Sequence, residues 1–461
     1  MRPWSTSSWP RPNRSREPSG PPVSGLENPR EWLTAHVNLE AGVGVPASTR
    51  RATTPTLDRI RGLLELLGSP EREFPAVHLT GTNGKTSTSR MISALLEALG
   101  LSVGRYTSPN LEYVNERLAW NDELISDSDL DDLLRLVAMV EPALPEPPSY
   151  FEILTAAAFR WFADLAVDVA VVEVGLGGTW DATNVLDSRV AVVTNVAIDH
   201  VEYLGPTREQ IAQEKAGIVH AGTTLVLGET DPDLVPFFLA RDADRVLLRD
   251  RDFAVLAQEL ALGGRVVDLS TPEASYSDLY LPLHGRHQAD NAAIALAAAE
   301  AFVGRPLPTT VVADGFASVR SPGRLEVVGR HPLVLLDGAH NVAGAAALRA
   351  ALDEEFAASS RTLVVGLLQE KEPHEMLAAL GLDDVNLLVC CRPPSPRGLD
   401  PAVVARAAEE LGFAPDRIEV HETVRDAIGA ALLATPEDGE LIVAGSLYTV
   451  GAARGVLVKT S

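Results

Sequence analysis

Residues 79–88 read L-T-G-T-N-G-K-T-S-T, between an apolar run at 74–78 and a segment of helical spacing at 89–99 that ends at Gly100. A strand, a loop containing Gly-Lys-Thr and a helix together bind nucleotide phosphates, because backbone N–H groups and the positive helix end face the anion. Leu79 replaces the first glycine of the strict G-x-x-x-x-G-K-[ST] motif. We therefore predict a phosphate-binding loop in which Gly81 and Gly84 supply the flexibility.

Lysine is rare in this chain, which has 35 arginines and four lysines: Lys85, Lys215, Lys371 and Lys459. An ammonium is a compact point charge and a titratable amine, and a guanidinium replaces neither role. Lys85 fits the first role, as a fixed charge beside a phosphate. Lys215 is a candidate for the second, whereas chance retention adequately explains Lys371 and Lys459.

The composition indicates a globular protein with a large acidic excess. The 461 residues are enough for two or more domains, and 46% are apolar. The net charge of −24 argues against a general nucleic-acid or anionic-membrane partner, and no apolar run reaches 18 residues. Cys390 and Cys391 are neighbours whose side chains would point to opposite faces of a strand, so we expect no disulfide between them and a reducing cytoplasm.

Predicted strands and helices alternate along the chain, which favours an α/β fold with a doubly wound, mainly parallel sheet. The alternation restarts after S-V-R-S-P-G-R at 318–324, with helices predicted over 342–356, 401–411 and 423–434. We therefore expect a disordered tail or an over-extended start (1–25), a phosphate-loop domain (26–318), a hinge (319–324) and a smaller C-terminal α/β domain (325–461).

Two predicted strands of the first domain end in candidate metal ligands. Glu173 ends an almost wholly apolar strand, where a carboxylate is unfavourable unless it meets a cation or caps a helix. With a phosphate loop nearby, it is a candidate Mg²⁺ ligand. Asp199 and His200 end another apolar strand, although a lone histidine is usually a core or surface residue. The loop at 177–184 is either a turn or a segment that covers substrate.

Three further residues keep open alternatives on residue chemistry alone. Lys215 lies on a short predicted helix, where a salt bridge is favoured over carbamylation, which would give it oxygen atoms for a metal. Asp337, in D-G-A-H-N between a strand and a helix, is either a ligand-facing carboxylate or an N-cap only. Arg324 is either a bidentate phosphate ligand or part of a surface ion pair.

Taken together, these segments resemble the bacterial folylpolyglutamate synthase/dihydrofolate synthase family, within the wider Mur ligase group. The similar motifs, between Thr80 and Asn341, are in order T-G-T-N-G-K-T-S, Y-T-S-P-N-L, S-Y-F-E, V-E-V-G-L-G-G, D-A-T-N, D-H, E-K-A-G-I, G-R-H-Q-A-D-N-A, S-P-G-R-L-E and D-G-A-H-N. G-S-L-Y-T-V-G near the end fits as well. The chain departs from the family with Gly-Lys-Thr-Ser for Gly-Lys-Gly-Ser, Ser-Pro-Asn for Ser-Pro-His, and Thr179 for an arginine, which leaves folate-site details open.

The resemblance implies a role for each position that matches the family motifs. ATP would contact Gly81, Thr82, Asn83, Gly84, Lys85, Thr86, Ser87, Asn291, Arg324 and Asp337. Two Mg²⁺ ions would be bound by Thr86, Ser108, Glu173 and His200. The pterin or folate would lie near Phe151, Glu152, Trp180, Asp181 and Ala182, and His340 and Asn341 would help to place L-glutamate. Lys215 would be carbamylated, and Lys85, Lys215, His200 and Arg324 would serve catalysis.

The implied activity is ATP-dependent ligation of L-glutamate to dihydropteroate, or to the glutamate tail of reduced folates, through an acyl phosphate. A Mur ligase acting on another carboxylate acceptor is one alternative, but the roughly 80 residues before the loop are too few for a further α/β domain. A P-loop regulatory ATPase is another, and it would leave D-G-A-H-N without a role. We expect a cytoplasmic monomer with small-molecule substrates.

Overall fold

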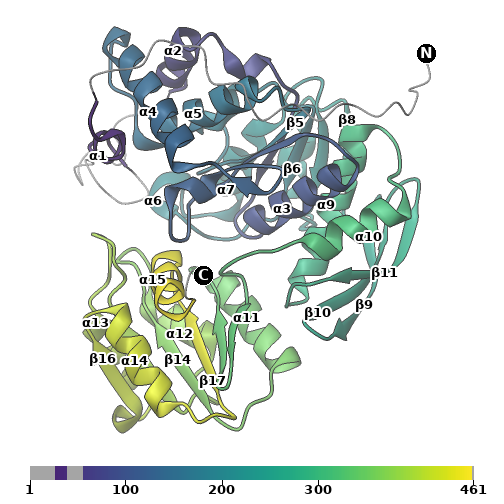
Figure 1. The fold of residues 1–461 in the computed structure, drawn as a ribbon. Coiled ribbons are helices and arrows are strands. Elements are labelled where there is room, and N and C mark those ends of the chain that lie inside the picture. The colour runs from purple at the N-terminus through teal and green to yellow at the C-terminus, as the bar shows by residue number, and fades with distance from the viewer. Residues whose placement is uncertain (1–25, 39–55, 459–461) are drawn as a thin grey trace.

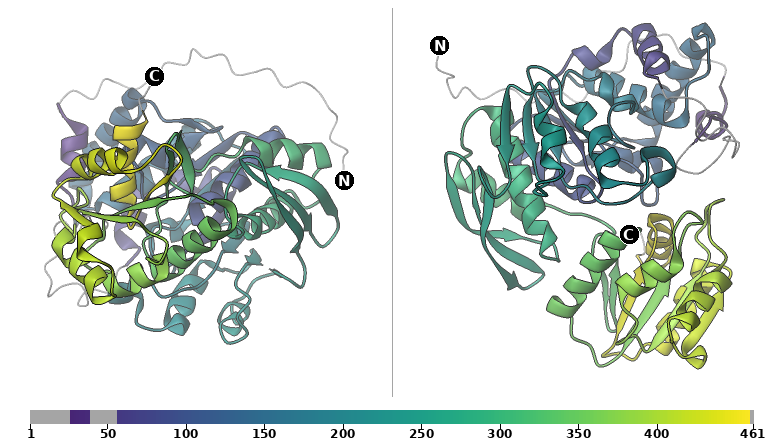
Figure 2. Two further views of the ribbon diagram at one scale, coloured as in Figure 1. Left: turned by 90° about the horizontal axis from the view of Figure 1, so that it is seen from below. Right: turned by 180° about the vertical axis from the view of Figure 1, so that it is seen from behind.

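The computed structural model describes residues 26–38 and 56–458, which form two α/β units (Figures 1 and 2). The first unit contains a large sheet and a small antiparallel sheet, and the second contains a single sheet. The predicted disordered tail at 1–25 and Lys459 lie outside the described residues. Within the two described ranges, no helix combines the length and the apolar character needed to cross a membrane.

The large sheet is mainly parallel, which confirms the predicted α/β fold. Six of its strands run parallel: β1, β2, β5, β6, β7 and β8. The other two, β3 and β4, form an antiparallel edge beside β2. In spatial order the strands are β4 (Glu123–Leu124), β3 (Leu118–Trp120), β2 (Val103–Tyr106), β5 (Val169–Glu173), β1 (Ala76–Thr80), β6 (Val190–Val193), β7 (Thr224–Leu227) and β8 (Arg245–Leu248). The carboxyl ends of the parallel strands meet at one edge, where open α/β sheets bind ligands.

Helices cover both faces of the large sheet, because alternate residues of each buried strand point to opposite sides. In β1, Val77 and Leu79 pack on one face and Ala76 on the other. The first face carries α3 (Lys85–Ala98), α9 (His287–Val303) and α10 (Thr309–Ser318). The second carries α2 (Asp58–Leu66), α4 (Asp127–Val140), α5 (Tyr150–Asp164), α7 (Arg208–Lys215) and α8 (Val235–Leu239), with the short helices α1 (Pro29–Thr34) and α6 (Val201–Leu204).

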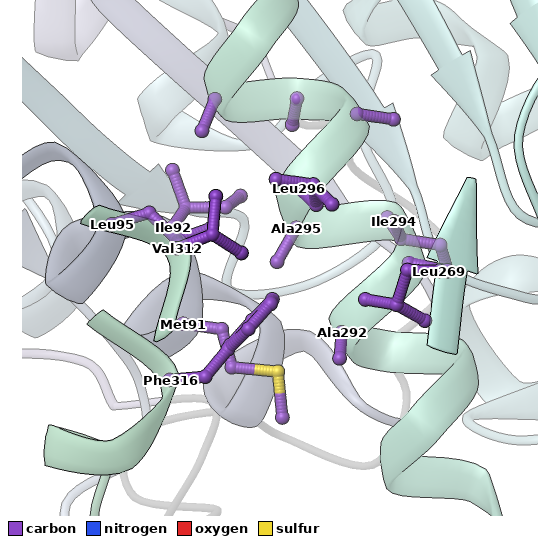
Figure 3. Close-up of a cluster of buried hydrophobic side chains, with 14 of the residues drawn as sticks. Met91, Ile92, Leu95, Leu269, Ala292, Ile294, Ala295, Leu296, Val312 and Phe316 are labelled. Carbon is purple, nitrogen blue, oxygen red and sulfur yellow. The ribbon is translucent and has the colours of Figure 1, made fainter. Parts of the chain in front are cut away.

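Helix α9 is the centre of the first core, and most of its residues are buried. Figure 3 shows Ala292 and Leu296 of this helix among Met91 of α3, Phe316 of α10 and Leu269 of the small sheet. The many alanines of α9 allow the neighbouring helices to approach closely. The small sheet consists of β9 (Ala254–Ala261), β10 (Gly264–Ser270) and β11 (Ser275–Leu281), in the order β11-β10-β9, and it adds to the elements predicted from the sequence.

The second unit is a six-stranded sheet whose only antiparallel strand in the described chain is β12, at one edge. In spatial order the strands are β12 (Glu326–Arg330), β13 (Leu333–Leu336), β17 (Glu440–Ala444), β14 (Arg361–Val365), β15 (Leu387–Cys391) and β16 (Ile418–His421). One face carries α11 (Val342–Glu355), α12 (Pro373–Leu380) and α13 (Pro401–Glu410), and the other carries α14 (Val424–Ala434) and α15 (Leu447–Leu457).

The three helices predicted for this second unit are confirmed to within one residue at each end. Residues 319–325 connect α10 to β12, and the predicted hinge at 319–324 falls in this connection. Figure 1 shows the second unit below the first, with the connection running between them. The domain boundaries themselves stay predictions.

Candidate active site

The predicted phosphate loop leaves the end of β1 and enters α3 through two glycines with positive φ. Gly81 has φ +151° and Gly84 has φ +82°, values that side chains rarely adopt. A Cβ on Gly81 would lie 1.8 Å from Thr194 Oγ1, and a Cβ on Gly84 would lie 2.5 Å from Asn291 Oδ1. The loop is therefore packed against the end of β6 and against Asn291 of α9, whose contact with ATP stays a prediction.

Asn195, directly after β6, fixes the shape of the loop. Its side-chain oxygen accepts the backbone N–H of Asn83 at 3.0 Å, and its carbonyl accepts that of Thr82 at 2.9 Å. The hydroxyl of Thr82 donates to the carbonyl of Ala197 at 3.1 Å. Asn195 was not predicted from the sequence, although it follows a strand end, the same signal that identified Glu173.

Lys85 lies within the loop, where its Nζ donates to the carbonyl oxygens of Gly81 at 2.9 Å and Thr82 at 3.2 Å. Burial lowers the pKa of Lys85, while the carboxylate of Glu173 opposes that shift. Ser87 Oγ lies 3.1 Å from Ser321 Oγ in the connection between the units. The first turn of α3 therefore contacts the connection between the two units.

The residues around Glu173 offer oxygen atoms of the kind that Mg²⁺ prefers. Thr86 Oγ1 donates to the Glu173 carboxylate at 3.1 and 3.2 Å, and burial raises the pKa of Glu173 to about 7. Its charged form therefore requires further positive charge. The buried Oγ of Ser108, after β2, has no hydrogen-bond partner among the described residues. Among the described residues, no group of three or more His, Cys, Asp or Glu side chains is arranged to hold a metal ion.

Lys215 is buried beside this group, whereas the side chain of His200 is about one third exposed, and the pKa of each is lowered. Burial lowers the pKa of His200 to about 3, so its imidazole is neutral at pH 7, as a metal ligand must be. Lys215, at the end of α7, forms no ion pair within 4.0 Å in the part of the chain that the structure describes. The salt bridge favoured by the sequence is therefore wrong. Burial, together with the charge of Lys85, lowers the pKa of Lys215 to about 7.

Asp199 is the centre of a contact between the two units. Its carboxylate accepts Lys371 Nζ at 2.5 Å and Asn341 Nδ2 at 2.9 Å, and it lies 3.4 Å from His340 Nε2. Asn341 Nδ2 also reaches Asn83 Oδ1 of the phosphate loop at 3.0 Å. Lys371 is thus part of the site, where the sequence had given this lysine no role.

Arg324, in the connection, and Asp337, in the second unit, lie near the phosphate loop and border the same cavity. Arg324 donates to the carbonyl of Gly338 at 3.4 Å. Asp337, at the end of β13, accepts the backbone N–H groups of Leu325 at 2.9 Å and Ala339 at 2.8 Å. Burial raises the pKa of Asp337, and the charge of Arg324 opposes this shift. The N-cap alternative for Asp337 is wrong, because the side chain that caps α11 is that of Asn341.

The predicted folate residues lie together on the side of α5 and the loop after β5. A Cβ on Gly175 would lie 2.5 Å from the ring of Phe151, so β5 and α5 are in close contact. The Glu152 carboxylate accepts the backbone N–H of Ser149 at 2.7 Å and pairs with Arg59 at 3.2 Å. Arg59 of α2, which was not predicted from the sequence, places a cation on this side.

The loop at 177–184 is held mainly by Asp181. Its carboxylate accepts Leu176 N–H at 2.9 Å and Thr183 N–H at 3.0 Å, and the Thr183 hydroxyl in turn meets His78 Nε2 at 2.8 Å. Burial raises the pKa of Asp181 to about 6. The carboxylate is thus largely engaged within the loop, while Trp180 and Ala182 also border the cavity described next.

One cavity of about 600 Å³ joins all these groups. Every predicted site residue borders it except Asn341, whose buried amide is used between the units instead. Further residues that border it and were not predicted include Arg59, Asn195, Lys371, Ser446 and Tyr448. The cavity therefore begins at the phosphate loop, passes the carboxylate of Glu173 and ends at the aromatic side of α5.

Comparison with known proteins agrees with this arrangement. Residues 79–299 match the Mur ligase middle domain, and residues 323–447 match the Mur ligase glutamate ligase domain. The chain is 44% identical over 441 residues to the dihydrofolate synthase/folylpolyglutamate synthase of Mycobacterium tuberculosis, covering 87% of this chain and 89% of the relative. It is 35% identical over 421 residues to the folylpolyglutamate synthase of Lacticaseibacillus casei, covering 89% and 96%.

Solved structures give the same result. The M. tuberculosis folylpolyglutamate synthase complexed with ADP aligns with a TM-score of 0.84 at 43% identity, over 89% of this chain and 96% of that chain. E. coli FolC in complex with DHPP and ADP aligns with a TM-score of 0.80 at 29% identity, over 94% and 97%. With two Mur ligase domains in this order and relatives matched over most of their length, the chain belongs to the folylpolyglutamate synthase/dihydrofolate synthase family of Mur ligases.

Proposed function

We propose that this protein uses ATP to join L-glutamate to the carboxylate of dihydropteroate or of a reduced folate. The observation that carries the proposal is the single cavity that extends from the phosphate loop to the aromatic side of α5 and is bordered by both units. A nucleotide, an acceptor and an amino acid must meet for this reaction, and a regulatory ATPase needs no such extended space. Family membership supports the same reaction.

In the proposed ATP site, the loop from Gly81 to Ser87 binds the phosphates through backbone N–H groups and the start of α3. Lys85, which now donates to two loop carbonyls, would turn to the phosphate oxygens. Arg324, Asp337 and Asn291 would complete the nucleotide site from the second unit and α9. Because both units contribute, their approach would also exclude water from a reactive intermediate.

Thr86, Ser108, Glu173 and His200 are the residues that would hold Mg²⁺. The unpaired Ser108 hydroxyl, the buried Glu173 carboxylate and the neutral His200 fit a divalent cation. Such a cation would offset the negative charge that moves during phosphoryl transfer.

Lys215 is the residue that would be carbamylated. Its ammonium form is disfavoured by burial and by Lys85, so a neutral amine able to react with CO₂ is available near pH 7. The amine nitrogen would attack the carbon of CO₂ and lose a proton. The product is a carbamate anion, whose two oxygen atoms can bind a metal ion as a carboxylate does. A carbamate would thus remove the conflict between two buried lysines.

The proposed reaction proceeds in two steps. The acceptor carboxylate attacks the γ-phosphorus of ATP, which releases ADP and forms an acyl phosphate. The α-amine of L-glutamate then attacks the acyl carbon, loses a proton, and phosphate leaves from the tetrahedral adduct to give the amide. Lys85 and Arg324 would stabilise the transferred phosphoryl group, Phe151 and Trp180 would contact the pterin, and His340 would help to orient glutamate.

Product mass spectrometry tests this proposal directly. The protein is incubated with ATP, Mg²⁺ and L-glutamate, with dihydropteroate in one reaction and tetrahydrofolate in a parallel one. Gain of one glutamate on dihydropteroate establishes the synthase step, and gain on tetrahydrofolate establishes chain extension. ATP hydrolysis without gain of glutamate on either acceptor refutes the assignment to folates.

We also propose that the protein acts as a monomer in the cytoplasm. Both cysteines are free and buried, which suits a reducing compartment. Light scattering of the purified protein would test the oligomeric state.

A further inference from the structure

The segment that carries Ser108 is built as a rigid loop after β2. The carboxylate of Glu116 accepts the backbone N–H groups of Leu111 at 2.7 Å and of Glu112 and Tyr113 at 2.9 Å each. The backbone N–H of Thr107 donates to the carbonyl of Arg117 at 3.0 Å, which closes the base of the loop. Ser108 therefore moves together with the rest of this segment.

The tip of the segment, at Leu111, packs on the second unit, although the chain before and after it belongs to the first unit. The side chain of Leu111 packs against the apolar cluster formed by the C-terminal sheet and its helices α14 and α15. A Cβ on Gly323 would lie 3.1 Å from a methyl carbon of Leu111 and 3.3 Å from Val450 Cγ1. Leu111, three residues after Ser108, is thus partly buried against the apolar cluster of the C-terminal unit.

Helix α15 contacts the backbone of the same tip. A Cβ on Gly451 would lie 2.0 Å from the carbonyl oxygen of Leu111, so only a glycine allows helix and loop to approach this closely. One turn later, Arg454 pairs with Glu112 and also donates to both carboxylate oxygens of Glu326 at 3.1 Å. Ser446, the N-cap of this helix, borders the cavity itself.

We infer that Gly451, Arg454 and Glu112 are positioning residues for Ser108. They hold the Ser108 segment in place only while the C-terminal unit is docked on the large sheet. The metal site is then complete only in the docked arrangement, so phosphoryl transfer is confined to the state in which both units surround ATP. This inference rests on the proposed function, because it assigns the docking contact to that metal site.

The Gly451→Ala variant is the sharpest perturbation. Alanine favours a helix interior more than glycine does, so α15 itself tolerates the change. The added methyl group must push the Leu111 carbonyl away and with it the Ser108 segment. The matched control is Gly429→Ala, in the interior of α14, where a Cβ would meet nothing within 4 Å.

The readout is Mn²⁺ binding to the full chain in the presence of ADP, measured by electron paramagnetic resonance titration, together with ADP binding without metal. We expect Gly451→Ala to weaken Mn²⁺ binding at least tenfold and to leave metal-free ADP binding within twofold of wild type. Gly429→Ala should match wild type in both. Mn²⁺ affinity within twofold of wild type in Gly451→Ala would overturn the inference while leaving the proposed function intact.

A second pair of variants decides the matter if Gly451→Ala does not fold. Arg454→Ala and Glu112→Ala should each weaken Mn²⁺ binding about threefold to tenfold. The double variant should bind Mn²⁺ no more weakly than whichever single variant has the lower Mn²⁺ affinity, because both substitutions remove the same ion pair. Arg349→Ala is the control, because Arg349 is about as exposed as Arg454 but pairs with Asp353 and Asp384 inside its own unit. Equal Mn²⁺ affinity in Arg454→Ala and Arg349→Ala would refute the positioning role. A wild-type protein that binds no Mn²⁺ with ADP would refute the proposed function itself.

Discussion

Replacing Glu355 by alanine should show how much the contact between the small sheet and the C-terminal unit contributes to the stability of the protein. The carboxylate of Glu355, at the end of α11, lies 2.5 Å from Arg265 Nη1 and 2.8 Å from His284 Nδ1, and it accepts the N–H of Gly285 at 2.8 Å. The Arg265 side chain is only 1% exposed and that of Glu355 only 3%. The substitution therefore leaves a buried guanidinium without its shortest ion-pair contact.

Breaking a buried ion pair by removing one partner costs about 3–5 kcal/mol. Glu354 remains 3.3 Å from Arg265, so we take the lower end, about 3 kcal/mol. At roughly 2–4 °C per kcal/mol for units of this size, the melting temperature should fall by about 6–12 °C in calorimetry. Glu354→Ala is the matched control, because Glu354 is more exposed, pairs with the largely exposed Arg286, and lies farther from Arg265, which keeps its shorter contact with Glu355. It should cost about 1 kcal/mol or less.

The same contact should depend on pH. Burial opposes the charge on Glu355, but the hydrogen bonds from His284 and from the Gly285 backbone outweigh burial and lower its pKa. The stabilisation is therefore fully present above the unfolded pKa of about 4.3 and is lost as the pH falls from there through the lower folded pKa. Equal melting temperatures for the Glu355→Ala and Glu354→Ala variants at pH 7 would refute this reasoning.

Three further predictions concern the active site. Arg324→Ala should lower kcat/KM for glutamate ligation by about 10²–10³-fold, since it removes a charge from the phosphoryl site, and an unchanged kcat/KM would contradict a site built from both units. With ¹³C-labelled bicarbonate, wild type should show a carbamate carbonyl signal by NMR that Lys215→Ala lacks. That signal should grow as the pH rises through about 7, because the neutral amine of Lys215 is the reactive form. Gly81→Ala should abolish ATP binding in calorimetry, because the new Cβ would lie 1.8 Å from Thr194 Oγ1; retained binding would show that the loop adapts.

The sequence predicted the site best where strand ends carry polar residues. Glu173 could be found because a carboxylate after an apolar strand needs a partner, and the parallel sheet then places it beside the phosphate loop. Lys371 could not be placed in this way, and for Asn341 the sequence indicated a place in the site but not its contacts. Their contacts with Asp199 join residues 172 and 142 positions apart, and they depend on how two units dock, which local patterns do not encode.

The region between β8 and the hinge was the least predictable part of the fold. Helix α9 is buried on nearly all sides, so it lacks the 3.6-residue alternation that marks an amphipathic helix. Strand β9 has mostly exposed or half-exposed residues, including Leu256 and Leu260, so its burial pattern does not alternate cleanly. Both features follow from the small sheet packing on α9, a contact that exists only in the folded unit.

Helix α11 connects two of the contacts between the units, the one at Asn341 and the one at Glu355, so it can act as a lever between them. Its first turn is capped by Asn341, and its last turn carries Glu354 and Glu355 against Arg265. Fourteen residues make a rod of about 21 Å. A tilt of about 10° around the Arg265 end would move the Asn341 end by roughly 4 Å, since the rod itself stays straight. A small rotation at the small sheet is thereby magnified into the making or breaking of every bond that Asn341 forms with Asp199 and the phosphate loop.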